Sequence, residues 1–378
     1  MNRSYDVCII GGGAAGLAAA ASIDPGIRTC ILEKNEILGR KILATGGGRC
    51  NLTNAGCEGV SATLDFFALQ GLETYCDDEG RYYPYSGCAS DVVEVLRRAL
   101  EERSCEALTG CEVQEIRQAG GGFEIVYRKS AGKKSAQERP ERSGVSVIKA
   151  EAVLIASGGK AAPQFGTTGD GYRLARSLGH SITRLYPILT GIECGDLSDL
   201  KGIRARGKVR LLKDGRTVAE ERGEIQFTKD GLSGICIFDL TPLIHAEEGE
   251  RPQDAFARYE LVVDLAPDFD QEQIDKRTST FGILNSRLAA RIGPDEIKAW
   301  HLPVLGIKGW RDAQVTAGGI RLEEVDPGSM ESKLVPGLYF AGEILDIQGP
   351  CGGYNLQNAW ETGRKAAKAI NEKRKGTF

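Results

Sequence analysis

Residues 5–16, which read YDVCIIGGGAAG, decide the fold of this chain. The apolar run at 7–10 is bounded by glycine, as expected for a strand buried on both faces of a parallel sheet. The glycines that follow, Gly11-x-Gly13-x-x-Gly16, open an alanine-rich helix expected over 17–22. The first glycine allows a tight turn, the second lets a pyrophosphate approach the backbone, and the third lets helix and strand pack closely. The amide hydrogens at the helix N-terminus favour phosphate binding.

A second strand is expected at 29–32, and Glu33 stands at its end, seventeen residues after Gly16. A carboxylate at this position can accept hydrogen bonds from the two hydroxyls of an unphosphorylated adenosine ribose. Glycine triplets also occur in ordinary turns. The order strand, glycines, helix, strand and acid nevertheless favours a dinucleotide site for NAD or FAD.

Length and composition limit the number of domains and the class of protein. The 378 residues predict two or three domains, and a net charge of -4 argues against a surface that binds nucleic acid. No stretch is apolar and long enough to span a bilayer and no signal peptide is apparent, so a cytoplasmic protein is expected. The 11 cysteines include no CxxC pair, which indicates buried thiols and neither a metal site nor a disulfide framework. The sequence does not specify the oligomeric state.

A basic, glycine-rich segment follows the second strand. Residues 33–54 read EKNEILGRKILATGGGRCNLTN and cannot form a regular helix or strand throughout. An extended loop is expected, with its backbone against a flat ligand and its cations facing phosphates or developing negative charge. A flexible surface loop is the alternative, but the apolar residues Ile42, Leu43 and Cys50 disfavour it.

At this point the sequence resembles a known family. The strings LGRKILATGGGRCNLTN (38–54), LIASGGK (154–160), EIQFTKDGLSGICIFDLT (224–241) and GLYFAGEILDIQGPCGGYNLQNAWETG (337–363) resemble the HI0933-like FAD-dependent flavoproteins, which include BaiN-like and aminoacetone oxidase-like proteins. The resemblance covers nearly the whole chain in the expected order. It implies FAD, held tightly and non-covalently, rather than NAD.

The first half is expected to complete the FAD-binding domain. Residues 61–105 are predicted to be mostly helical, and strands are expected at 111–116, 123–128 and 145–148. The polar stretch 128–144 between them is expected to be a hairpin tip. Another strand ends in the small residues Ala156, Ser157 and Gly158, and a helix is expected from about Asp170 to Gly179.

The sequence pattern of residues 189–308 differs from that of the segments on either side. Arg204, Arg206, Lys208 and Arg210 alternate along a strand, which is expected to present a solvated face or to attract an anion. A turn is expected at 213–216, and the apolar run 235–238 is expected to continue a β-rich unit. With helical residues at 268–300, this insert is predicted to be a β-barrel-like domain with a small helical lobe that acts as a substrate cap.

The chain then returns to the first domain with a strand at 338–341 and a helix from about Asn355. A helix N-terminus directed at the pyrimidine end of a flavin stabilises the reduced ring. Glu343 is expected near the ribityl or pyrophosphate region, and an ion-paired structural carboxylate is its alternative role.

Together these patterns predict an α/β protein, with a Rossmann-like FAD-binding domain in two parts (1–188 and 309–378) and an inserted domain (189–308). The predicted cofactor-binding residues are Gly11, Gly13, Ala14, Ala15, Gly16, Glu33, Lys34, Arg40, Lys41, Gly46, Gly48, Arg49, Cys50, Asn51, Val113 (by analogy with related flavoproteins), Ala156, Ser157, Gly158, Gly342, Glu343, Gly353, Tyr354, Asn355 and Leu356. Weak candidates for catalysis are Lys41, Cys50, Asn51 and Asp346.

Three function classes stay open at this stage. The first is an oxidoreductase that uses NAD(P)H as a transient donor to reduce a carbon–carbon double bond in an apolar or steroid-like small molecule. The second is an oxidase of a small amine such as aminoacetone, and the third is an FAD-containing redox sensor or RNA-associated flavoprotein. The sequence has no second strand-GxGxxG-helix unit, so a nicotinamide donor would bind transiently near the flavin.

Overall fold

A computed structural model describes residues 3–130, 144–247 and 249–376 of the chain. The polar stretch expected as a hairpin tip falls largely outside these residues. The chain divides into two compact units, the first made of Met1–Leu185 with Thr316–Phe378 and the second of Tyr186–Val315. The short strands β10 (Tyr186–Ile188) and β18 (Val315–Ala317) lie where the chain passes from one unit to the other. No helix among the described residues has the length and apolar content needed to cross a membrane.

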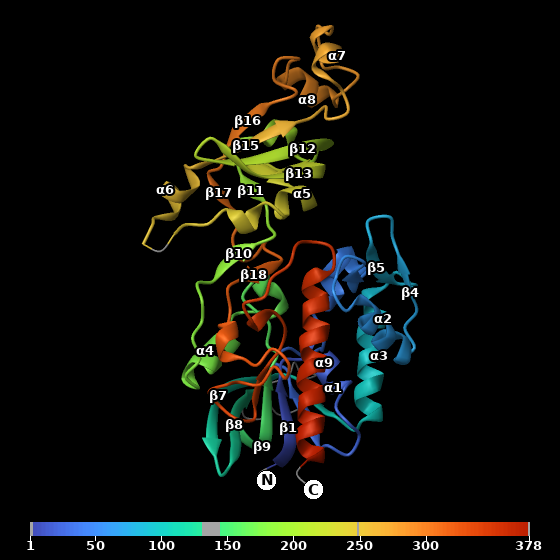
Figure 1. Ribbon diagram of the computed structural model, residues 1–378, viewed down its shortest axis with the longest axis vertical. Helices are drawn as coiled ribbons and strands as arrows, with labels where there is room; N and C mark the ends of the chain where they lie inside the picture. Colours follow the sequence, from blue (N-terminus) through green and yellow to red (C-terminus); the bar gives the residue numbers. More distant parts are fainter. Residues whose placement is uncertain (1–2, 131–143, 248, 377–378) are drawn as a thin grey trace, which may run out of the picture. The chain divides into compact units, whose positions relative to one another are not determined.

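The first unit is built on a seven-stranded sheet (Figure 1). Its order is β6-β2-β1-β9-β8-β7, with β19 paired to β9. The central neighbours β2, β1, β9 and β19 are parallel, as expected of a Rossmann-like sheet. The strands are β1 (Arg3–Ile10), β2 (Thr29–Leu32), β6 (Glu106–Leu108), β7 (Cys111–Ala119), β8 (Gly122–Lys129), β9 (Val145–Ile155) and β19 (Leu338–Phe340).

Strand β9 joins two segments that the sequence predicts as separate strands. Its residues 145–150 pair with β8, and the whole span from Ile148 to Ile155 pairs with β1. Lys149 and Glu151 interrupt the apolar pattern, but both side chains are exposed. The part of β9 that pairs with β8 is solvated on one face, and it continues directly into a part that is buried on both faces.

The helices of the first unit are α1 (Ala14–Ala20), α2 (Val60–Leu69), α3 (Ala89–Glu102), α4 (Asp170–Ser177) and α9 (Tyr354–Lys375). Helix α4 confirms the start expected at Asp170. The expectation that 61–105 is mostly helical is wrong in its middle, where β4 (Thr74–Cys76) and β5 (Arg81–Pro84) form a small sheet with β3 (Thr53–Asn54). Tyr82 and Tyr83 are consecutive residues of β5, and aromatic residues favour strands.

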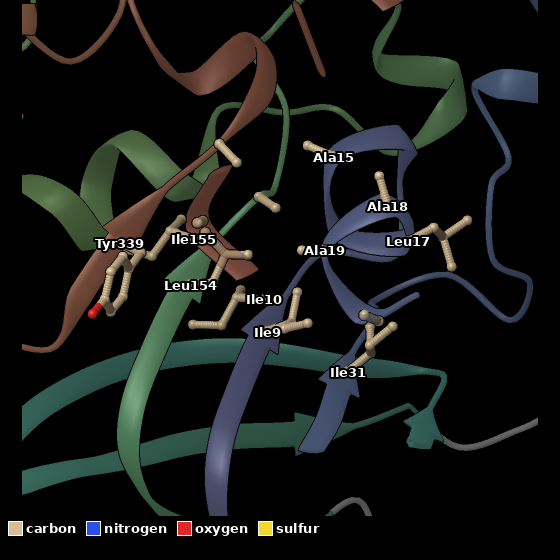
Figure 2. Close-up of a cluster of buried hydrophobic side chains, with 14 of the residues drawn as sticks. Ile9, Ile10, Ala15, Leu17, Ala18, Ala19, Ile31, Leu154, Ile155 and Tyr339 are labelled. Carbon is tan, nitrogen blue, oxygen red and sulfur yellow. The ribbon is translucent and has the colours of Figure 1, made fainter. Parts of the chain in front are cut away.

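Apolar side chains from α1, β1, β2 and β9 form the core beneath the glycine turn (Figure 2). Ile9, Leu17, Ile31 and Leu154 are all fully buried. Helix α9 packs against α1 at a glycine: a Cβ atom at Gly363 would lie 2.3 Å from the carbonyl oxygen of Ala15. The C-terminal helix therefore lies directly behind the turn that the sequence singles out.

The second unit contains an antiparallel seven-stranded sheet in the order β16-β15-β12-β13-β14-β11-β17, where a β-barrel-like domain is expected. The run 235–238, expected as part of the β-rich unit, is instead the short helix α5. Gly234 ends the preceding strand with φ +114°, a value that other residues rarely adopt. The elements are β11 (Ile192–Glu193), β12 (Arg204–Lys213), β13 (Arg216–Phe227), β14 (Gly231–Ser233), α5 (Ile235–Phe238), α6 (Pro252–Phe256), β15 (Tyr259–Asp264), α7 (Gln271–Asp275), α8 (Ser286–Arg291), β16 (Trp300–Pro303) and β17 (Gly306–Ile307).

Two of the four alternating cations on β12 form ion pairs with the neighbouring strand. Lys208 Nζ lies 2.8 Å from Glu220, and Arg204 lies 3.0 Å from Glu224, both on the neighbouring strand β13. The expected turn is present between these strands, with Asp214 and Gly215 at positive φ. Arg204 and Lys208 thus belong to a solvated, ion-paired part of the strand face.

A buried histidine joins three segments of the first unit. His180 Nδ1 lies 3.0 Å from Glu324 Oε2, and its Nε2 lies 2.8 Å from Ser332 Oγ. Ser332 Oγ also accepts hydrogen bonds from the backbone amides of Leu334 and Val335, so its own proton is available for His180 Nε2. This arrangement suits the neutral imidazole.

The pH dependence of stability follows from this site. Burial lowers the pKa of His180, although Glu324 opposes the effect. As the pH falls through about 6.5, His180 takes up a proton in the unfolded chain, whereas it stays neutral in the folded chain. We expect stability to fall below that pH, by at most about 1.4 kcal/mol per pH unit from this group. Urea unfolding from pH 7.5 to 5 should show a shallower pH dependence for His180→Asn than for the wild type. The exposed His301→Asn is the control, and equal slopes in all three proteins would contradict the assignment.

Candidate functional site

An open cleft lies at the carboxyl ends of the parallel strands of the first unit. Such an edge is where open α/β sheets bind their ligands. Residues that the sequence predicts for a dinucleotide line this cleft: Gly11, Gly13, Glu33, Lys34, Arg40, Lys41, Val113, Ala156 and Ser157. Asn35, Phe165, Gly166 and Thr167 line it as well, and no local motif indicates them.

The glycine turn is shaped for a close ligand. Gly11 has φ +106°, and a Cβ atom there would lie 2.5 Å from the carbonyl oxygen of Ala156. A Cβ atom at Gly13 would meet nothing within 4 Å, so the protein itself leaves this side open. Gly13 is also the N-cap of α1 and provides no side-chain cap, which leaves the first amides of the helix available. This cradle fits a pyrophosphate.

Glu33 is held in one orientation by its neighbours. Its side chain accepts a 2.7 Å hydrogen bond from the Gly12 amide and a 2.8 Å bond from the Asn35 amide. The residue is buried, yet its carboxylate lines the cleft. Its Oε1 also accepts a 2.6 Å bond from the side-chain amide of Asn35. A carboxylate keeps an acceptor position after three such bonds, so a hydroxyl donor of a ribose can still reach it.

Lys34 and Ser157 both line the cleft, but their side chains have different surroundings. Lys34 forms an ion pair with Asp170 at the start of α4. Burial raises the pKa of Asp170, but hydrogen bonds from Lys34 and Thr168 outweigh it and lower the pKa overall. Ser157 Oγ, in contrast, is buried and has no hydrogen-bond partner among the described residues. A Cβ atom at Gly171 would lie 2.0 Å from this oxygen, so the hydroxyl packs against the first turn of α4.

The glycine-rich loop is a broken 3-10 helix (Ile42–Gly48) rather than the expected extended segment. Gly46, Gly47 and Gly48 have positive φ, and Cβ atoms at Gly47 and Gly48 would meet nothing within 4 Å. All three glycines are in the left-handed region, and Gly47 and Gly48 present bare backbone on an open side.

Cys50 ends this loop with φ 60°, and its side chain is buried. Burial raises the pKa of its thiol to about 12. A thiol in this state is not the activated thiolate that nucleophilic catalysis requires. The next residue, Asn51, lies beside Gly46, where a Cβ atom would approach the Asn51 amide to 2.9 Å.

Glu343 connects the loop to the far end of the chain. Its Oε2 lies 2.8 Å from Lys41 Nζ, and its Oε1 accepts a 2.9 Å hydrogen bond from the Thr316 amide. Thr316 Oγ1 in turn accepts bonds from the amides of Lys160 and Ala161. Glu343 is thus ion-paired, and its place near the ribityl or pyrophosphate region stays a prediction. The contact of Thr316 with Glu343 has no sequence signal.

The loop before α9 is closed by Asn355. Its side chain accepts from the Gly349 amide at 2.9 Å and donates to the Gly349 carbonyl at 2.8 Å. Gly353 is the N-cap of α9, and a Cβ atom there would lie 2.6 Å from the Thr53 carbonyl oxygen. The first amides of α9, at Tyr354, Asn355 and Leu356, therefore stand at a turn that only glycine can make.

Asp346, a weak candidate for catalysis, accepts a 2.8 Å hydrogen bond from Thr183 Oγ1. The Gly342 amide donates to Thr362 Oγ1, while Gly158 has positive φ beside Thr167.

No cluster of potential metal ligands occurs among the residues that the structure describes.

Comparisons with known proteins show the family to which this chain belongs. The model of the family described as "HI0933-like protein Rossmann domain" matches residues 5–63 and 59–369. A 3-dehydro-bile acid delta(4,6)-reductase from Clostridium scindens is 34% identical, with 99% of this chain and 100% of that protein covered. A ribosomal RNA dihydrouridine synthase from Haemophilus influenzae is 26% identical, with 98% and 100% covered.

A solved structure shows the same fold at low sequence identity. It is a 3-ketosteroid-delta4-(5alpha)-dehydrogenase from Rhodococcus jostii RHA1, with a TM-score of 0.54 and 14% identity. The alignment covers 98% of this chain and 97% of that one.

Proposed function

Since this chain belongs to the HI0933-like family of FAD-dependent oxidoreductases, we propose that it reduces a carbon–carbon double bond in an apolar, steroid-like small molecule. The observation that carries the proposal is the 34% identity to the bile acid reductase over essentially the full length of both chains. The prefix 3-dehydro denotes a ketone, and delta(4,6) denotes double bonds conjugated with it. A conjugated ketone is therefore the substrate class.

We assign the chain's own residues the following roles. FAD, when bound, supplies hydride transfer. Gly11 and Gly13 hold its pyrophosphate against bare backbone, and Glu33 accepts hydrogen bonds from its ribose. The first amides of α9 face the pyrimidine end of the flavin, where they stabilise negative charge. Cys50 remains a structural thiol, and the unit of residues 186–315 serves as the substrate domain.

The electron donor that we propose is NADH or NADPH, bound transiently. A cytoplasmic location suits such a donor. Nucleic acid is the less favoured partner, although two RNA-modifying relatives are 26% identical. The net charge is -4, and the cations at the start and middle of β12 are paired with carboxylates of β13. Such a surface attracts phosphates weakly.

Anaerobic stopped-flow absorbance tests the proposal. We expect NADH or NADPH to bleach the flavin, and a 3-oxo-4-ene steroid then to restore the colour faster than air does. The product should gain two hydrogens by mass spectrometry. Reduction by aminoacetone with rapid reoxidation in air would instead indicate the amine oxidase. Reoxidation by a uridine-containing ribosomal RNA fragment, but by no steroid, would indicate the RNA enzyme.

A further inference from the structure

Arg49 differs from the other cations of the glycine-rich segment. Lys34 is paired with Asp170, Lys41 is paired with Glu343, and Arg40 donates to Asn35 in the ribose end of the cleft. Arg49 is exposed, and within the described part of the chain it forms no ion pair. Its positive charge is therefore available to a ligand.

The guanidinium of Arg49 is nevertheless held in place. It lies 4.5 Å from the centroid of the Tyr83 ring, and its Nε donates to the Gly46 carbonyl at 3.4 Å. Tyr83 is buried and stacks on Tyr75 with ring centroids 5.8 Å apart. A Cβ atom at Gly46 would lie 3.3 Å from the Tyr83 ring, so the glycine backbone rests on the same support.

A cation fixed on a buried ring is preorganised, because little side-chain freedom is lost when a ligand binds. The nearby Arg81 cannot take this role, since it is paired with Asp77 and Glu79. Arg49 also directly follows Gly48, which the sequence predicts to bind FAD.

We propose that Arg49 binds the carbonyl oxygen of the substrate and stabilises the negative charge that forms there during reduction. This role rests on the proposed function. FAD, when bound and reduced, would supply the hydride for the new C–H bond at the β-carbon, and the π electrons of the double bond would then rest on the carbonyl oxygen as an enolate beside Arg49. A water molecule then protonates the α-carbon, and the carbonyl group is restored. Positive charge at the oxygen favours the first of these steps.

The direct test is the binding of 4-nitrophenol, whose phenolate resembles an enolate. The wild type should ionise the bound phenol at lower pH than free solution. Arg49→Gln should raise the apparent pKa of the bound phenol by about one unit or more, and Arg49→Lys should raise it less. Arg277→Gln is a matched control, because Arg277 is also exposed and lies over an aromatic ring, that of Phe269. Flavin content and the unfolding midpoint report whether each variant is intact.

Kinetics separate this role from binding of a remote anion. We expect Arg49→Gln to lower kcat about 100-fold for a steroid acid and for its methyl ester alike. Tyr83→Leu should lower kcat less, whereas Tyr83→Phe keeps the ring and should be nearly neutral. A rise in KM for the acid alone, with kcat unchanged, would overturn the proposal and make Arg49 a carboxylate anchor. An unchanged phenol pKa in Arg49→Gln, with an active wild type, would overturn this role and leave the proposed function standing. Failure of the wild type to reduce any conjugated ketone would overturn the proposed function itself.

Discussion

A Gly13→Asp variant is expected to purify folded but without FAD. A side chain at this position meets no protein atom within 4 Å, and Gly13 has φ -87°, which any residue adopts. Aspartate is also a good N-cap, so it should stabilise α1 by up to about 1 kcal/mol in the absence of ligand. Against a pyrophosphate the same carboxylate places like charges together, which costs several kcal/mol. The affinity for FAD should fall on the order of 100-fold or more.

The matched control is Gly13→Asn, which has nearly the same size and capping ability but no charge. We expect it to lose far less affinity than the aspartate variant. Flavin absorbance per protein and fluorescence titration of the apoprotein measure both. A Gly13→Asp protein that retains a full complement of FAD would mean that the pyrophosphate lies elsewhere.

Gly363→Ala is expected to destabilise the first unit although it improves helix propensity. Alanine in the middle of a helix gains about 1 kcal/mol over glycine. Here the added Cβ would lie 2.3 Å from the Ala15 carbonyl oxygen, a backbone atom that cannot rotate away. Overpacking of this kind costs about 1–3 kcal/mol or more, and α1 would also shift beneath the glycine turn. We therefore expect a net loss of stability and weaker FAD binding.

Urea unfolding and FAD titration check this second result. Gly309→Ala serves as the control, because a Cβ atom at Gly309 meets nothing within 4 Å and no positive φ is required there. Its unfolding midpoint should remain the same or rise slightly. An equal midpoint for Gly363→Ala and the wild type would show that the close approach of α1 and α9 is not needed.

Much of the fold can be predicted because its decisive features are local. The apolar run before Gly11, the helix after it and the strand ending at Glu33 each carry their own pattern. The run 235–238 is mispredicted because four apolar residues suit a strand or a helical turn equally well, and the choice depends on how Gly234 packs against Glu224.

The candidate site is predictable to the extent that it depends on glycines and on cations in one segment. The cleft residues Asn35 and Thr167 carry no motif. The contacts of Glu343 with Lys41 and Thr316 join segments far apart in the chain, and sequence spacing says nothing about such distances. The support of Arg49 by Tyr83 is hidden for the same reason, since it depends on β5 lying against the loop.

The division of the first unit into two stretches of chain affects the order in which the protein can assemble during synthesis. Strand β19 pairs with β9, and α9 packs behind α1, but residues 186–315 must be translated between them. The inserted unit is continuous and can fold on the ribosome as soon as it emerges. The surfaces of β9 and α1 that contact β19 and α9 stay exposed until residues 316–378 have been translated. The predicted FAD-binding residues Gly342, Glu343 and 353–356 lie in this last stretch, so we expect FAD to bind only after the whole first unit has been translated.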